Sequence, residues 1–405
     1  MTVTFWKEKI RNYAEEHAAE AERLLKELAV IPAPSGKEKR RGDFCRKWLE
    51  THGAEGVYED SAGNIIYPYE ISRRSRLAVC MAHLDVVFPD EDRLVIRQKE
   101  HLLTGPGVGD DTANLVNLLM AAAFFAQEKP NLQMGILFVA DTGEEGLGNL
   151  KGCRQLMKDF GNRLAQVISL DLYLGQCFNR CVGSLRYEVT VRTEGGHSFS
   201  AFGNPSAVHQ ISRLVCALYG QQVPGRAQTT YNVGTIEGGT SVNTIAQEAR
   251  ILYEIRSVDA GCMEEMRQGF EEIIRRFSAE GMCLEVRQVG ERPCAGRMDE
   301  ASEAVWGRLV ETAAEVIYRA AGQEVSLEAA STDANIPLSL GIPAVTLGTI
   351  AGGGAHTREE WVDLRSQRTG MKLVLELLFA LQREQQSEQQ GEQQGEYGET
   401  AVFFV

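Results

Sequence analysis

The stretch LAVCMAHLD, residues 77–85, is the part of the sequence that decides the fold. Its first six residues form an apolar run of the length expected for a strand buried on both faces, and His83 and Asp85 follow directly. Similar runs at 134–140 and 166–170 predict further buried strands, and the segment 115–125 predicts a helix. Buried strands that alternate with helices are typical of an α/β sheet with helices on both faces.

The sequence before this stretch predicts helices. Residues 5–29 carry apolar side chains at helical spacing, so we expect one amphipathic helix there. Pro32 and Pro34 end it, and Ser35 is placed to cap a second helix that runs to about Thr51.

The pattern changes after Gly183, which indicates a second domain. The segments 185–192 and 245–255 alternate between polar and apolar residues, as strands exposed on one face do, and helices are predicted near 206–219 and 263–277. After a further strand at 284–289, the β/α pattern resumes with a strand at 344–347 and a last helix to about Leu381. We therefore expect a discontinuous domain of residues 1–183 and 298–382, an inserted α+β domain of residues 184–297, and a Gln- and Glu-rich, disordered tail at 383–405.

Composition excludes several classes of function. A net charge of −14 over 405 residues disfavours binding to nucleic acid or to an anionic membrane surface. The charged N-terminal region has no apolar core of a secretory signal, and no later stretch has the length of a membrane span. Nine scattered cysteines favour free thiols in a reducing compartment, so we expect a cytoplasmic protein.

Acidic and histidine side chains follow the predicted strands and turns at several separate places. They are His83 and Asp85, the pair Asp110-Asp111, the pair Glu144-Glu145, Asp171, and His356. In open α/β sheets, ligands bind where strands end at their carboxyl side. Carboxylates and imidazoles that converge there are what a site for two metal ions requires.

Each of these pieces has a plainer interpretation when it is taken alone. A single HxD triplet is most often a hydrogen-bonding pair, adjacent acids usually mark a solvated loop or a helix start, and Asp171 could cap a turn. The turn GPGVG, residues 105–109, suggests a dinucleotide loop, but it lacks the third glycine and ends in two acids that would repel a pyrophosphate. The combination of all the segments is what predicts a shared metal site.

The motifs, in their order and spacing, resemble those of the M20 metallopeptidases, the group that includes peptidase T, glutamate carboxypeptidase and the amino-acid deacylases. The matching motifs are AHLD (82–85), GPGVGDD (105–111), DTGEEGLG (141–148), SLDLYLG (169–175), EGGHS (194–198), SVNTIAQEA (241–249), EIRS (254–257), STDAN (331–335) and GGGAHTREEWV (352–362). The resemblance covers nearly the whole chain up to about Leu381. It implies a zinc-peptidase-like catalytic domain with a mixed sheet, and an inserted lid and dimerisation domain.

The resemblance also implies a ligand set for two divalent metal ions, zinc, manganese or cobalt. Asp110 would bridge the two ions. His83 and Asp171 would complete one site, and Glu145 and His356 the other. Many relatives carry a lysine after the paired aspartates, where this sequence has Thr112. Thr112 opens a helix and is not expected to bind metal, so we expect the change to alter substrate choice rather than abolish activity.

Further residues match the family's catalytic and substrate-binding positions. Asp85 would orient the imidazole of His83, and Glu144 would be the general base. In the lid, His197 would stabilise the oxyanion, and in dimeric members it reaches the partner's active site. Asn243 and Arg256 would hold a carbonyl or carboxylate of the substrate. The plainer alternatives are a hydrogen-bonded turn histidine for His197 and a strand-surface salt bridge for Arg256.

The resemblance therefore implies a metal-dependent hydrolase of di- or tripeptides, a tripeptidase or aminopeptidase that acts as a homodimer joined through the lid. A deacylase of N-acyl amino acids and a hydrolase of N-carbamoyl amino acids are alternatives on the same scaffold. A binding protein with a dead site is a third possibility, but every expected ligand and Glu144 are present in the sequence.

Overall fold

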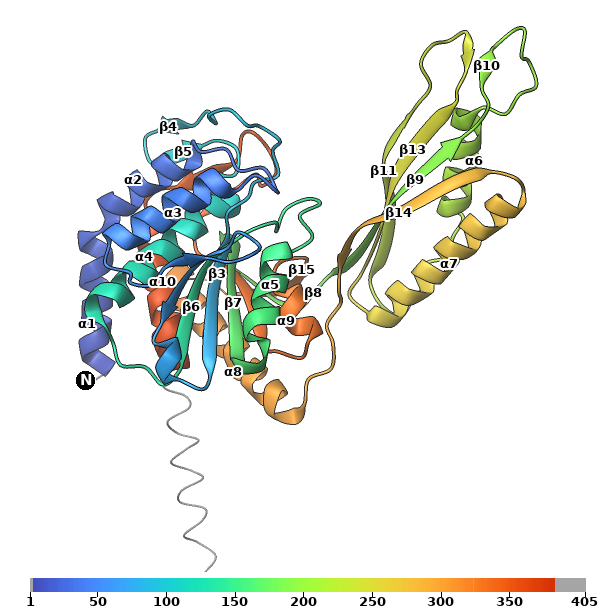
Figure 1. Ribbon diagram of the computed structural model, residues 1–405. Coiled ribbons are helices and arrows are strands. Elements are labelled where there is room, and N and C mark those ends of the chain that lie inside the picture. The colour runs from blue at the N-terminus through green and yellow to red at the C-terminus, as the bar shows by residue number, and fades with distance from the viewer. Residues whose placement is uncertain (1–2, 323, 383–405) are drawn as a thin grey trace, which may run out of the picture. The chain divides into compact units, whose positions relative to one another are not determined.

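The computed structural model describes residues 3–322 and 324–382 (Figure 1). It divides into two compact units. Unit 1 comprises residues 1–179, 298–328 and 332–405, and unit 2 comprises residues 180–297 and 329–331. The predicted disordered tail at 383–405 lies outside the described residues.

The N-terminal helices of unit 1 differ from the prediction in two details. Helix α1 (Val3–Glu16) and helix α2 (Ala18–Ala29) replace the single helix expected over 5–29. They separate at His17, whose backbone leaves the helical region (φ −100°, ψ 6°). Helix α3 (Lys39–Thr51) begins after Glu38, so Ser35 does not cap it. The Ser35 hydroxyl instead donates a hydrogen bond to the carboxylate of Asp85.

The large sheet of unit 1 is mixed, and its parallel centre contains the stretch at 77–85. Its eight strands lie in the order β1-β2-β6-β3-β7-β16-β8-β15. Strands β6, β3, β7 and β16 are parallel, whereas β2 and β8 pair antiparallel with β6 and β16. The strands are β1 (Tyr58–Glu59), β2 (Ile65–Tyr69), β3 (Leu77–His83), β6 (Gly135–Asp141), β7 (Leu164–Leu174), β8 (Gln176–Cys181), β15 (Ser326–Ala330) and β16 (Ala344–Gly348).

Helices cover both faces of this sheet. The main apolar core joins one face to helices α4 (Asn114–Glu128), α8 (Glu300–Ala321) and α10 (Ser366–Leu381). Helices α5 (Lys151–Phe160) and α9 (Asn335–Ser339) contact each other on the opposite face from α4 (Figure 1). Every residue from Asn114 to Ala126 of α4 is buried, which explains why its sequence is apolar on all sides. This arrangement confirms the predicted α/β class with a mixed sheet and helices on both faces.

A smaller sheet in unit 1 holds the segments that flank the predicted metal site. Strands β17 (Gly352–Gly353), β18 (Trp361–Asp363), β5 (Leu102–Thr104) and β4 (Arg97–Lys99) form it in that order. The π-helical turn η2 (Val108–Ala113) follows β5 and leads into α4. Short 3₁₀ turns, η1 (Ile71–Arg73) and η3 (Gly161–Arg163), precede β3 and β7.

Unit 2 is an antiparallel sheet with helices on one face. Strands β11 (Thr229–Gly238), β13 (Glu248–Ser257), β9 (Gly183–Arg192) and β14 (Cys283–Arg292) lie in that order, and β11 is one that the sequence pattern did not reveal. Alternate residues of β9 and β13 pack with helices α6 (Ala207–Tyr219) and α7 (Ala260–Ala279) in one apolar cluster. A two-stranded ribbon, β10 (Gly196–His197) and β12 (Thr244–Ile245), adjoins this sheet. Across both units, no helix among the described residues combines the length and apolarity needed to cross a membrane.

Candidate metal centre

Segments from five parts of unit 1 bring the predicted ligands together. His83 is the last residue of β3, and Glu145 follows β6. Asp171 lies inside β7, which continues to Leu174, whereas the prediction ended this strand at Leu170. Asp110 belongs to the turn η2, and His356 follows β17. Strands β6, β3 and β7 are parallel neighbours, so their carboxyl ends meet at one edge of the large sheet. The peptide between Asp110 and Asp111 is cis.

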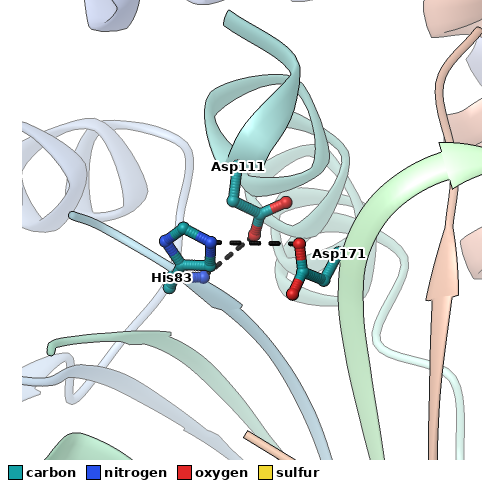
Figure 2. A group of neighbouring side chains, drawn as sticks. All are labelled: His83, Asp111 and Asp171. Carbon is teal, nitrogen blue, oxygen red and sulfur yellow. Dashed lines mark hydrogen bonds and ion pairs between the residues drawn. The ribbon is translucent and has the colours of Figure 1, made fainter. Parts of the chain in front are cut away.

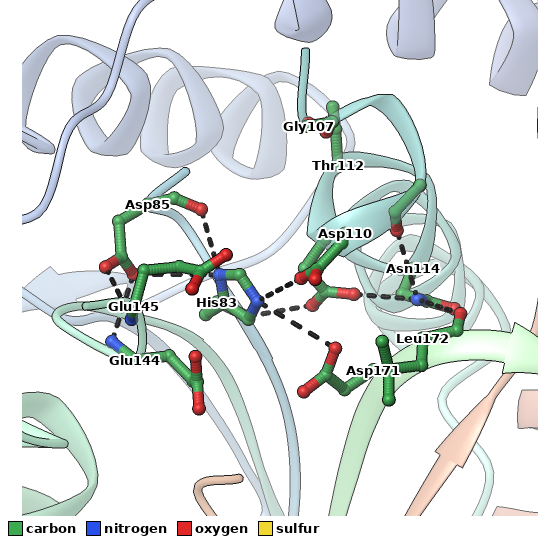
Figure 3. A network of polar contacts seen from close by, with 12 residues as sticks. His83, Asp85, Gly107, Asp110, Thr112, Asn114, Glu144, Glu145, Asp171 and Leu172 are labelled. Atoms are coloured by element: carbon green, nitrogen blue, oxygen red, sulfur yellow. Dashed lines mark hydrogen bonds and ion pairs between the residues drawn. The ribbon is translucent and has the colours of Figure 1, made fainter. Parts of the chain in front are cut away.

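The carboxylate of Asp110 lies between the two histidines. Its Oδ1 is 3.0 Å from Nε2 of His83 (Figure 3). Its Oδ2 is 3.3 Å from Nε2 of His356. Nε2 of His356 is also 3.3 Å from Oε1 of Glu145, and Nε2 of His83 is 3.9 Å from Oδ1 of Asp171. One carboxylate thus presents an oxygen to each of two groups of ligands. The His356 side chain is 57% exposed, whereas that of His83 is 1% exposed, so the His356 side of the centre is the more open.

Asp111 is a buried acid in this centre to which the sequence assigned no role. It forms a possible metal-binding group with His83 and Asp171, whose ligand atoms lie within 4.8 Å of one another (Figure 2). A second such group joins His83, Asp110 and Glu145. However, Oδ2 of Asp111 accepts the backbone N–H of His83 at 3.0 Å, and Oδ1 accepts Nδ2 of Asn114 at 2.7 Å. Because both Asp111 oxygens hold protein donors, Asp110 is the better ligand of the pair.

The carboxylate of Asp85 forms hydrogen bonds with backbone N–H groups rather than with the imidazole of His83. Its oxygens accept the backbone N–H groups of Gly143, Glu144 and Glu145 at 3.1, 3.1 and 2.9 Å (Figure 3). Nδ1 of His83 donates instead to the backbone carbonyl of Asp85 at 2.9 Å, and lies 3.6 Å from the carboxylate. The expected orientation of His83 by the Asp85 side chain stays a prediction, because the carboxylate lies near Nδ1 while it accepts hydrogen bonds from the turn at 143–145. The hydrogen bond to the Asp85 carbonyl orients His83, with Nε2 toward Asp110.

Burial and crowding control the protonation of this centre. Burial opposes a charged His83, but the carboxylates of Asp111, Asp110 and Asp171 outweigh it and raise the His83 pKa well above its usual value. Hydrogen bonds to Asp110 and Glu145 raise the pKa of His356 to about 11. Burial raises the pKa of Asp171, and the charge of Asp110 adds to this effect. Burial also opposes the charged form of Asp110, yet its contacts with His356 and His83 lower its pKa.

The residues fit a pair of divalent cations. Imidazole nitrogens and carboxylate oxygens are ligands that zinc, manganese and cobalt accept. Oδ1 of Asp171 is buried and has no hydrogen-bond partner among the described residues, although it points into the centre near His83. A buried carboxylate oxygen without a donor is costly unless a cation compensates it.

Glu360 supports the centre from the small sheet, and the sequence analysis missed it. Its Oε1 accepts the backbone N–H groups of Gly109 and Asp110 at 3.0 and 2.7 Å, and the hydroxyl of Tyr173 at 3.1 Å. Burial, with the nearby charge of Asp110, raises the pKa of Glu360 to about 7. The signal in the sequence was the acid pair that follows His356 in the GGGAHTREEWV motif.

The remaining predicted residues lie in two places. Glu144 is 5% exposed and lies in the turn that Asp85 holds. His197, Asn243 and Arg256 belong to unit 2. Nδ1 of the exposed His197 accepts the backbone N–H of Phe199 at 3.2 Å, and Nε of Arg256 donates to Glu254 at 2.8 Å. Asn243 is exposed, and its Oδ1 accepts the hydroxyl of Ser241. These are the local contacts that the plainer alternatives for His197 and Arg256 anticipated.

Comparison with known proteins identifies relatives over most of the chain. A succinyl-diaminopimelate desuccinylase of Corynebacterium glutamicum is 23% identical over 346 residues, which cover 83% of this chain and 90% of the relative. A tripeptidase structure from Staphylococcus aureus superposes with a TM-score of 0.70 at 19% identity, covering 90% of this chain and 99% of that one. A di-peptidase structure from Saccharomyces cerevisiae gives 0.72 at 14% identity, covering 93% and 98%.

The model of peptidase family M20/M25/M40 matches residues 79–380, which begin in β3 and end in α10. This range includes every predicted ligand, from His83 to His356. The chain therefore belongs to peptidase family M20/M25/M40 and is a hydrolase of that family.

Proposed function

We propose that this protein hydrolyses the amide bond of small peptides with two divalent metal ions. The observation that carries the proposal is the carboxylate of Asp110, which presents one oxygen to His83 and the other to His356. A carboxylate in that position is suited to bridge two cations, each completed by ligands from its own side. His83 and Asp171 would complete one site, and Glu145 and His356 the other.

Two bound divalent cations would polarise the scissile carbonyl and lower the pKa of water toward neutrality. The neighbouring glutamates have separate tasks in this proposal. Glu145 would be a metal ligand, and its Oε1 lies 3.3 Å from Nε2 of His356, the other proposed ligand on that side. Glu144 takes a proton from the attacking water and passes it to the leaving nitrogen, which is the work of a general base and acid. Asp85 fixes the backbone of both residues, so the two carboxylates keep different directions.

Unit 2 would supply substrate contacts. In the proposed reaction, Nε2–H of His197 donates to the oxyanion, because Nδ1 already accepts backbone N–H groups and so leaves the proton on Nε2. Asn243 and Arg256 would hold the carbonyl or carboxylate of the substrate. Arg256 suits a carboxylate because its planar guanidinium can donate two parallel hydrogen bonds.

The active form is proposed to be a homodimer joined through unit 2. Strand β11 lies at an edge of the sheet of unit 2, so one side of its backbone has no strand partner among the residues that the structure describes. Large apolar side chains are exposed on the same unit, with Phe199 at 89%, Phe202 at 90% and Val242 at 101% exposure. Such exposed apolar groups favour a protein partner over solvent. Light scattering of the native chain and of a Phe199→Ser/Phe202→Ser variant tests the dimer.

A cytoplasmic location is supported by the cysteines. All nine lie among the described residues, and none of them forms a disulfide. Free thiols are typical of proteins in a reducing compartment.

The substrate is tested by a screen of chelator-treated protein reloaded with zinc, manganese or cobalt. Dipeptides, tripeptides, N-acyl amino acids and N-carbamoyl amino acids would be compared by kcat/KM. We expect the highest kcat/KM with a di- or tripeptide. A preference for N-acyl or N-carbamoyl amino acids would replace peptidase activity by the alternative reaction on the same scaffold. No hydrolysis with any metal, together with no bound metal, would refute the proposal.

A further inference from the structure

Arg41 of helix α3 is a fully buried cation beside the metal centre. Its side chain is 0% exposed. Nε and Nη2 donate to the carbonyl of Ile31 at 3.2 and 2.6 Å, and Nη1 donates to the carbonyl of Leu84 at 2.9 Å and to Oγ1 of Thr112 at 3.4 Å. The three acceptors of these four hydrogen bonds are neutral, and among the described residues no carboxylate lies within ion-pair distance of this guanidinium.

These contacts tie together the two segments that carry the inner ligands. Leu84 lies between His83 and Asp85, and Thr112 follows Asp110-Asp111 directly. The Thr112 hydroxyl donates to the carbonyl of Gly107, so its lone pair is available to Arg41. Gly107 has φ +66°, and a Cβ there would lie 2.3 Å from the side chain of Val86. The guanidinium therefore links the loop after β3 to a turn that packs closely against that same loop at Val86.

Burying a charge without a counterion is costly. The charge of Arg41 is therefore kept only if negative charges nearby stabilise it. The acids of the centre provide such charges. Asp85, Asp110, Asp111 and Asp171 are each 6% exposed or less, and Asp85 attracts the Arg41 charge. In the metal-free protein these buried acids also repel one another, and the permanent cation beside Asp85 offsets part of their negative charge.

We propose that Arg41 is a positioning residue that holds the metal-free centre in its binding geometry, by bridging Leu84 to Thr112 and by offsetting the buried acids. The inference rests on the proposed metal site. Arginine is suited to this role because it stays charged when buried and donates in several directions from one plane. Bound cations tie the same two segments through His83 and Asp110 and neutralise the same acids. The contribution of Arg41 is therefore largest when the metals are absent.

The test compares thermal unfolding of the full chain after chelation and after addition of zinc chloride. The variants are Arg41→Met, which removes the charge and the bridge, and Arg41→Lys, which keeps the charge. Arg163→Met is the matched control. Nη2 of Arg163 also joins two backbone carbonyls, those of Ile71 and Arg74 at 2.6 and 2.7 Å, at the start of β7.

We expect Arg41→Met to lower the Tm of the chelated protein by about 5 °C or more, and to lower that of the zinc-loaded protein by much less. Arg41→Lys should fall between the native chain and Arg41→Met. Arg163→Met should lower the Tm of the chelated protein and that of the zinc-loaded protein by equal amounts. An equal loss in both forms for Arg41→Met would show that Arg41 only packs the fold, and would overturn the proposal. Arg41→Lys as unstable as Arg41→Met in the chelated form would also overturn it, because the charge would then have no part.

The result separates this inference from the proposed function. If zinc fails to raise the Tm of the native chain, the metal site itself is wrong. If zinc raises it and the variants do not follow the expected order, the metal site stands and the role of Arg41 is refuted. If chelated Arg41→Met is unfolded at all temperatures, the Tm of Arg41→Lys is compared between the chelated and the zinc-loaded forms instead.

Discussion

The candidate residues of unit 1 and those of unit 2 differ in how the protein holds them. His83 and Asp110 are 1% and 6% exposed, and elements far apart in sequence fix their backbones through Asp111 and Glu360. His197 and Asn243 are exposed, and the hydrogen bonds of their side chains are with residues two or three positions away, although the backbones of their two segments pair in the β10–β12 ribbon. The difference indicates that contacts between distant segments hold the candidate metal ligands, whereas short-range contacts hold the side chains of unit 2 that are proposed to meet the substrate.

The bridging carboxylate gives the largest expected effect. Asp110→Asn removes the charge that is proposed to serve both cations, so we expect metal affinity to fall by more than about 100-fold, since residues that merely orient ligands contribute about 10–100-fold. Activity should fall to the background of the assay. Metal analysis after dialysis and a kcat/KM measurement check this. Asp90 forms a surface ion pair with Arg358, and Asp90→Asn is the control. This variant should change neither metal content nor kcat/KM. Full metal content in Asp110→Asn would contradict the bridging role.

The neighbouring glutamates separate catalysis from metal binding. Glu144→Ala should lower kcat by roughly 10²–10⁴ through loss of the general base, with normal metal content. Glu145→Ala, the matched variant one residue away, should lose metal as well as activity. Steady-state kinetics with metal analysis distinguishes the two. Substantial turnover by metal-loaded Glu144→Ala would remove Glu144 from the mechanism.

The test for unit 2 is His197→Ala. Loss of an oxyanion donor costs about 10²–10³ in kcat, and metal content should stay unchanged because His197 is outside the centre. His209→Ala on helix α6 is the control, since that histidine is exposed and outside every matched motif. Unchanged kcat in His197→Ala would leave only the turn hydrogen bonds as its role.

Proton release is the smallest effect expected. The pKa of His356 is raised to about 11 by Asp110 and Glu145, so His356 is protonated in the metal-free protein at pH 7, and the pKa of His83 is raised as well. Metal ligation needs neutral imidazole, so zinc binding should release roughly one to two protons. Calorimetry in two buffers of different ionisation enthalpy measures this number. Zinc binding without any release at pH 7 would contradict the charged state.

The sign of the accompanying stability change follows from the raised pKa. Protonated His356 stabilises the metal-free fold fully below its usual pKa of 6.5, and this contribution is lost as the pH rises through about 11. Zinc-loaded protein should lack that dependence, because the metal replaces the proton. Unfolding of the chelated and loaded protein across this pH range compares the two.

The parts of the site that were predictable from sequence are those fixed by one strand and the loop after it. His83 and Glu145 follow apolar runs, so their meeting at a sheet edge could be inferred. The contacts of Asp85, Arg41 and Glu360 could not, because each depends on packing between distant segments. Glu360 reaches the backbone of Asp110 across 250 positions. Which atom of Asp85 faces His83 is decided by a turn more than fifty residues later.

The same distinction holds for the fold. Apolar runs identified β3, β6, β7 and β16 because these strands are buried on both faces. Strand β11 escaped notice because most of its residues are exposed or half-buried, so burial imposes little alternation on them. The break between α1 and α2 was invisible because the apolar spacing continues across His17 and only the backbone changes.

The position of β16 has a consequence for how the protein is made. This strand sits between β7 and β8 in the middle of the large sheet, yet it is synthesised after all of residues 183–292, which contain the four-stranded sheet of unit 2. A ribosome needs roughly 10–35 s to add the residues between β7 and β16. During that interval the nascent chain holds a finished inserted domain, while β7 still offers an unfilled edge to other chains. The insertion thus delays completion of the large sheet until the whole of the inserted domain has been synthesised.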